Sequence, residues 1–270
     1  MSGAVPGVHF RIAMRITLKP SIWSLFVLTI AAICIFAFRS SGRDDVRKLS
    51  EIPTTVIWAW ERPENLKFID PRKIGVAYLA KTLSLSAQTV ITRPRLQPLE
   101  LPANTKVIAV VRIESDRIEK PALTDSQLNQ LVGEIVLLKE LNISAIQIDF
   151  DATTSERSFY RKLIVDVSKQ ISPLPLSITA LASWCTGDRW LQELPIGEAV
   201  PMLFRMGVER GAFASRLAEG NNTFATPCDH AAGVSTDELI AAPKVDRLYL
   251  FSPKPWTPIS LKQAIEDFQR

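Results

Sequence analysis

The sequence of 270 residues carries a formal net charge of +4, and 47% of its residues are hydrophobic, enough to bury the core of a globular domain. The positive excess lies in the first 50 residues, which hold seven Lys or Arg and two Asp, so the rest of the chain is close to neutral. A near-neutral globular part lacks the basic surface that neutralises phosphates, which excludes nucleic acid as the expected partner.

The amino-terminal part divides into three segments. Residues 1–19 are basic, Pro20–Phe38 is a run of nineteen residues without a charge, and residues 39–51 form a polar tether. A helix of about twenty apolar residues crosses a bilayer, so the middle segment predicts a transmembrane signal anchor. No small-x-small cleavage site follows it, which favours retention over cleavage as a signal peptide. We expect an inner-membrane anchor with the domain facing the periplasm or the extracellular side, although basic residues on both sides leave the charge rule undecided.

Residues 52–270 alternate strand-like and helix-like runs and form the predicted domain. The eight strand-like runs are Thr55–Trp60, Gly75–Leu85, Lys106–Ile113, Ala145–Phe150, Leu176–Ala182, Ala199–Arg205, Ala231–Ser235 and Val245–Phe251. Amphipathic helical patterns lie at Gln127–Glu140, Ser155–Gln170, Glu209–Ala218 and Ser260–Phe268. Three of these begin at a capping box, formed by Thr124 with Gln127, Thr153 with Glu156, and Ser260 with Gln263.

Eight strands alternating with helices predict an α/β fold, a small (β/α)8 TIM-like barrel. The proline-rich stretch between Leu85 and Lys106 predicts an extended excursion in place of a helix, so the helices are expected to be degenerate. An open doubly wound sheet is the alternative. No glycine-rich phosphate motif follows a strand and no Cys/His spacing suits zinc, so no cofactor or metal is expected.

The fourth strand-like run ends in two carboxylates. Successive side chains of a strand point to opposite faces, so Gln147, Asp149 and Asp151 share one face and the intervening apolar residues share the other. The flanking helical patterns favour a parallel unit whose apolar face meets the helices. The polar face is then expected to point into the barrel or a cleft.

The carboxyl ends of barrel strands meet at one rim, where the other strands also end in polar and aromatic residues. These candidates are Trp58, Trp60, Glu61, Arg112, Glu114, Trp184, Arg205, Asp237, Glu238 and Trp256. Carboxylates and arginines bind hydroxyl groups directionally, and indole rings offer flat apolar surface to a sugar. Two carboxyl groups flanking a glycosidic oxygen would supply an acid and a base or nucleophile, so Asp149, Asp151 and Glu114 are the catalytic candidates and the others would bind substrate. Structural ion pairs and core packing are the alternative roles.

Two further features bear on the domain. Cys185 and Cys228 are candidates for a disulfide if the domain is exported, and two buried free thiols are the alternative. The segments Ile146–Asp151, Phe159–Arg161 and Leu176–Trp184 resemble an uncharacterised family of bacterial exported proteins, the domain of unknown function 3142 family. The resemblance covers most of residues 55–256 and implies a glycoside-hydrolase-like TIM barrel without an assigned activity.

More distantly, the fourth strand is similar to that of the chitinase-type hydrolases, whose Asp-x-Asp-x-Glu ends in the acid. Thr153 stands at the Glu position here, which argues against a chitinase-like mechanism. We expect a membrane-anchored barrel that acts on an envelope carbohydrate, with Asp151 as the acid and Asp149 orienting it or stabilising positive charge on the sugar. A barrel that binds polysaccharide without catalysis is the alternative, and the missing third acidic residue favours it.

Overall fold

The computed structural model describes residues 48–186, 188, 190–207, 210–218, 224–241 and 243–268. The expected anchor Pro20–Phe38 and residues 39–47 of the tether lie outside these residues. Within the described ranges, no helix combines the length and apolar character that a membrane crossing requires.

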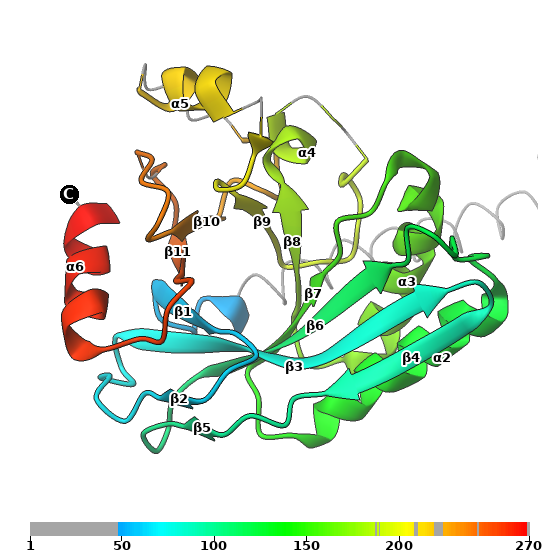
Figure 1. The fold of residues 1–270 in the computed structure, drawn as a ribbon, viewed down its shortest axis with the longest axis horizontal. Coiled ribbons are helices and arrows are strands. Elements are labelled where there is room, and N and C mark those ends of the chain that lie inside the picture. Colours follow the sequence, from blue (N-terminus) through cyan, green and yellow to red (C-terminus); the bar gives the residue numbers. More distant parts are fainter. Residues whose placement is uncertain are drawn as a thin grey trace, which may run out of the picture. The chain divides into compact units, whose positions relative to one another are not determined.

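Eight parallel strands close into a barrel (Figure 1). They are β1 (Thr55–Ala59), β3 (Ile74–Ser86), β6 (Val107–Ser115), β7 (Ala145–Asp149), β8 (Leu176–Leu181), β9 (Glu198–Met202), β10 (Ala231–Ser235) and β11 (Arg247–Phe251). The ring closes because β1 pairs in parallel with both β3 and β11. Each of the eight strands overlaps one of the predicted runs, with ends that differ by up to three residues, so the TIM-like barrel is confirmed and the open sheet is wrong.

The first two crossovers contain no helix. Between β1 and β3 the chain forms only the short strand β2 (Glu64–Asn65), which pairs with β5 (Leu99–Glu100) in a separate small sheet. Between β3 and β6 it forms β4 (Thr89–Pro94), which pairs antiparallel with β3 outside the ring. The expected extended excursion is therefore confirmed, and it places β4 beside the barrel mouth.

The helices that follow β6 in the chain include α2, α3 and α6, which pack against the barrel from two sides. They are α2 (Asp125–Val136) with η1 (Leu137–Glu140), α3 (Arg157–Ile171) preceded by η2 (Thr154–Glu156), α4 (Ala182–Thr186), α5 (Arg210–Ala218) and α6 (Pro258–Phe268). Figure 1 shows α2 and α3 together, and α6 on the other side beside β11. The short α4 was not predicted from the sequence.

Two of the three predicted capping boxes are confirmed, and the third is wrong by one turn. Thr124 and Gln127 exchange backbone-to-side-chain hydrogen bonds of 3.2 Å, and Thr153 pairs in the same way with Glu156. Helix α6 begins earlier than expected. Thr257 is its N-cap residue and exchanges bonds of 2.9 and 3.1 Å with Ser260. Pro258 fits the first helical position because that backbone nitrogen needs no intrahelical partner.

The two faces of β7 divide as the alternation predicts. Ile146, Ile148 and Phe150 are buried in one core cluster with the apolar stripes of α2 and α3. Gln147, on the other face, is fully buried inside the barrel and hydrogen-bonded to side chains of β1 and β8. The helices therefore take up the apolar face of β7, and the polar face is left to the barrel interior and its mouth.

Candidate functional site

A cavity of about 510 Å³ opens at the carboxyl ends of the barrel strands. Eight of the predicted site residues line it: Trp58, Trp60, Glu61, Arg112, Glu114, Asp149, Asp151 and Arg205. They come together because parallel strands of a closed barrel all end at the same rim. Gln147, Trp184, Asp237, Glu238 and Trp256 do not line the cavity.

Asp149 ends β7 in the wall of the cavity, where 15% of its side chain is exposed. Its Oδ1 accepts a hydrogen bond of 2.7 Å from Thr179 Oγ1, and its Oδ2 lies 3.5 Å from Arg112 Nη1. Burial raises the pKa of this carboxyl above its usual value, and the negative charge of Asp151 acts in the same direction. Arg112 and Thr179 oppose the shift without cancelling it. Asp149 therefore retains a proton to higher pH than an ordinary aspartate.

Asp151 lies two residues beyond Asp149 and is exposed at the cavity. Among the described residues, its carboxylate has no hydrogen-bond or ion-pair partner. Both oxygens are therefore available to a ligand or a water molecule.

Glu114, the third catalytic candidate, is held between two arginines. Arg112 Nε lies 2.8 Å from one carboxylate oxygen and Arg93 Nη2 lies 3.0 Å from the other. The two guanidinium groups satisfy and neutralise this carboxylate, so it has less freedom to act on a substrate than Asp151 has. Arg93 was not predicted. It reaches the cavity from β4, where it pairs across the ladder with Thr82.

Aromatic rings form the apolar part of the cavity. Trp58 is 3% exposed, and its Nε1 donates to Gln147 Oε1 at 3.3 Å, so it belongs to the cavity floor. Trp60 is only partly buried, and its ring meets Phe251 edge-on with centroids 6.0 Å apart. The guanidinium carbon of Arg112 lies 5.3 Å from the Trp60 ring centroid. Trp60 is thus the indole whose surface a ligand can reach.

The loop after β9 brings Arg205 to the cavity. Its backbone has φ +53°, and its guanidinium lies over Phe251 at 5.6 Å. Glu238 accepts a 3.0 Å hydrogen bond from the Arg205 backbone N–H and pairs with Arg210 at 3.7 Å. Asp237 accepts a hydrogen bond from Ser235. Glu238 and Asp237 therefore hold loops at the rim, outside the cavity lining.

Trp184 and Trp256 lie in the core, where each is 3% exposed. Trp184 belongs to α4 and packs edge-to-face on Trp190 with centroids 4.8 Å apart. Trp256 Nε1 donates to the Trp58 carbonyl at 2.9 Å and its ring packs among residues of α6. Neither indole offers a face to a ligand. Their sequence positions after predicted strands did not distinguish them from Trp60, because it is α4 and the turn before α6 that direct these two side chains away from the barrel mouth.

A buried polar network lies beneath the cavity, inside the barrel. Gln147 donates to Ser177 at 3.0 Å, and Ser177 donates to Glu198 at 3.2 Å. Glu198 also accepts a 2.5 Å bond from the Tyr249 hydroxyl and a 2.6 Å bond from Arg247. Of these residues, only Gln147 was predicted to face inward. The others could have been predicted from the polar residues that stand at inward-facing positions of the other predicted strands.

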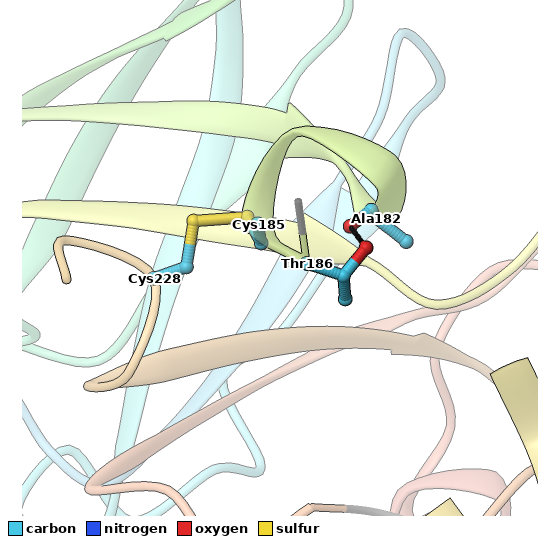
Figure 2. The surroundings of a disulfide bond; sticks show 4 residues. All are labelled: Ala182, Cys185, Thr186 and Cys228. Atoms are coloured by element: carbon cyan, nitrogen blue, oxygen red, sulfur yellow. Dashed lines mark hydrogen bonds between the residues drawn. A yellow bond between two sulfur atoms is a disulfide. The ribbon is translucent and has the colours of Figure 1, made fainter. Parts of the chain in front are cut away.

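Cys185 and Cys228 are joined by a disulfide, with Cα atoms 5.7 Å apart (Figure 2). The bond ties α4 to the segment before β10, and both residues are 1% exposed. In Figure 2, Thr186 of the same short helix bonds through its hydroxyl to the Ala182 carbonyl at 3.4 Å. The disulfide therefore anchors the connection that follows β8.

In comparisons with known proteins, the chain matches no family model and no curated protein. Within the part of the chain that the structure describes, no three His, Cys, Asp or Glu side chains are grouped so that they could hold a metal ion. Function must therefore be inferred from the barrel and from the geometry of its cavity.

Proposed function

We propose that the protein binds a carbohydrate at the barrel mouth and hydrolyses a glycosidic bond there. The observation that supports this most directly is the pair Asp149 and Asp151 in one cavity, the first with a raised pKa and the second free of partners among the described residues. Glycoside hydrolysis needs one protonated carboxyl group that reaches the glycosidic oxygen and one ionised carboxyl group on the other side of the scissile bond. Trp60 adds a partly exposed ring on which a sugar can stack.

The burial of Asp149 supports a revised division of roles. From the sequence, Asp151 was assigned as the acid and Asp149 as the group that orients it. A general acid must keep its proton near the working pH, and the raised pKa fits Asp149 to that task. Asp151 is then the base or nucleophile, because its carboxylate is exposed and unpartnered among the described residues. Glu114 acts indirectly by positioning Arg112.

Reducing-end release tests the proposal. The full chain, purified in detergent, is incubated with envelope glycans, and new reducing ends are counted. Asp149→Asn and Asp151→Asn should each lower the rate by about 10²–10⁴-fold, the usual contribution of a positioned acid or base. Asp125→Asn, a change of the same type at an 89%-exposed position on α2, should leave the rate unchanged. Absence of turnover with every glycan class would refute hydrolysis.

Binding of polysaccharide without catalysis is the second candidate function. The pairing of Glu114 with Arg93 and Arg112 favours it, because these ion pairs take one of the three candidate catalytic carboxylates out of the chemistry. Glycan binding that is equal in the parent and in Asp151→Asn, with no turnover in either, would support this candidate over the enzyme.

We also propose that the domain is exported and anchored to the membrane, with an envelope polysaccharide as its partner. The uncharged run Pro20–Phe38, the resemblance to a bacterial exported family and the Cys185–Cys228 bond all support export, since disulfides persist in oxidising compartments. Protease added to spheroplasts should degrade the domain while the membrane stays intact. Protection of the domain until the membrane is lysed would refute export.

A further inference from the structure

A second cavity of about 640 Å³ adjoins the first, on the side of the barrel mouth next to η2. Arg112, Glu114 and Asp151 line both cavities, so they stand at the boundary between the two. Each volume lies within the range of about 300–1,000 Å³ that is typical of ligand pockets. A chain-like ligand in the first cavity can therefore continue past Asp151 into the second.

The acidic side chains of the second cavity are almost all committed to protein donors. Glu156 is 6% exposed and bonds to Ser115 and to the backbone and hydroxyl of Thr153. Asp116 accepts from two backbone N–H groups of its own loop at 2.7 and 3.0 Å, and these bonds hold its pKa below the usual value. Glu114 is paired with its two arginines. Apart from Asp151, which stands at the boundary with the first cavity, the carboxylates thus have most of their acceptor capacity taken up by protein donors.

The cations contributed by this loop are not committed. Arg117 and Lys120 line the second cavity, are exposed, and make no hydrogen bond or ion pair with any residue that the structure describes. Their loop is nonetheless held in place, since Asp116 bonds to its amides and the Ala87 N–H donates to the Glu119 carbonyl at 3.0 Å. Beyond Asp151, the free charged groups that line this cavity are therefore cationic donors on a fixed loop. Such donors form their strongest bonds with ionised oxygen acceptors.

We propose that the second cavity binds an acidic sugar unit of the glycan, whose carboxylate or phosphate group pairs with Arg117 and Lys120. The inference rests on the proposed carbohydrate function and adds the substrate class, an anionic glycan that extends to both sides of Asp151. The first cavity holds the neighbouring unit against Trp60, and the second selects for charge.

Equilibrium binding to matched probe pairs tests the proposal on the full chain in detergent. One pair is tetragalacturonate and its methyl ester, and the other is phosphorylated mannopentaose and mannopentaose. The parent should bind the anionic member of at least one pair about tenfold more tightly, the gain expected from charge-assisted bonds by partly exposed groups. The pair that shows the preference identifies the anionic group as carboxylate or phosphate.

Two double variants distinguish a preference that comes from the second cavity from one that comes from the overall charge of the protein. Arg117→Ala with Lys120→Ala should abolish the preference while the neutral probes bind as before. Lys73→Ala with Lys139→Ala removes the same charge from exposed positions before β3 and β7, at the opposite end of the barrel, and should retain the preference. Equal affinity for both members of both pairs in the parent, or a preference that survives in the Arg117/Lys120 variant, would overturn the proposal.

This test is independent of hydrolysis, because binding is measured without turnover. A charge preference in a protein that releases no reducing ends would support the acidic-glycan site and refute the enzyme. Turnover of neutral glycans without a charge preference would support the enzyme and refute the acidic-glycan site.

Discussion

Removing the positive member of the buried Glu198–Arg247 pair should destabilise the barrel strongly. The two side chains are 1% and 7% exposed and lie 2.6 Å apart, and Arg247 also donates to the carbonyls of Leu49 and Ile52. Arg247→Met keeps a similar volume but leaves the Glu198 carboxylate in the interior with no cation. Breaking a buried pair from one side costs about 3–5 kcal/mol. For a domain of this size we expect Tm to fall by roughly 6–20 °C.

Urea unfolding followed by circular dichroism measures this loss. The double variant Glu198→Gln with Arg247→Met removes both charges and should be more stable than Arg247→Met alone, because no unpaired charge remains buried. Arg72→Met, which breaks an exposed pair with Asp70, should leave the unfolding midpoint unchanged. A loss below about 1 kcal/mol for Arg247→Met, or a double variant less stable than the single one, would refute the reasoning about burial.

Three further predictions follow from the site and the disulfide. Replacing Cys185 and Cys228 by Ser should lower the free energy of unfolding by about 4 kcal/mol, the value that loop-closure entropy gives for a separation of 43 residues. Equal urea midpoints for parent and variant would contradict this prediction. The pKa of Asp149 is higher in the folded protein than in the unfolded chain, so the stability that its protonated form contributes is fully present below the unfolded pKa and is lost as pH rises through the folded pKa. Asp149→Asn should therefore be more stable than the parent at neutral pH, and the difference in the free energy of unfolding should close in acid. Unfolding curves at several pH values check this, and a stability difference between variant and parent that grows in acid would contradict the prediction. Trp60→Ala should weaken glycan binding roughly tenfold with little change in unfolding, whereas the same change at the buried Trp184 should mainly lower stability, which calorimetry and binding titrations distinguish.

The location of the site was predictable because it depends on local alternation. The period of two in β7 placed Asp149 and Asp151 on the face opposite the isoleucines, and the flanking helical stripes showed which face would be covered. The cavity residues from β1 and β6 follow from the same rule. Once a strand is recognised, its last inward residues must reach the barrel mouth.

Other parts of the site depend on contacts between distant segments. Arg93 reaches the cavity from a strand outside the ring, and its pairing with Glu114 follows from the antiparallel register of β4 on β3. The second cavity depends on how the loop after β6 lies against η2, where Glu156 bonds to Ser115 across 41 positions of sequence. No periodicity within one segment carries that information.

The sequence by itself determined the eight strands, their alternation of inward and outward faces and the two carboxylates at the end of β7, because each follows from neighbouring residues along the chain. Only the tertiary structure decided four other features: the closure of the ring, the burial that raises the Asp149 pKa, the neutralisation of Glu114 and the direction of each tryptophan. The physical reason is that burial and charge pairing are set by atoms that surround a side chain in space, and these come from strands and loops far apart in the sequence.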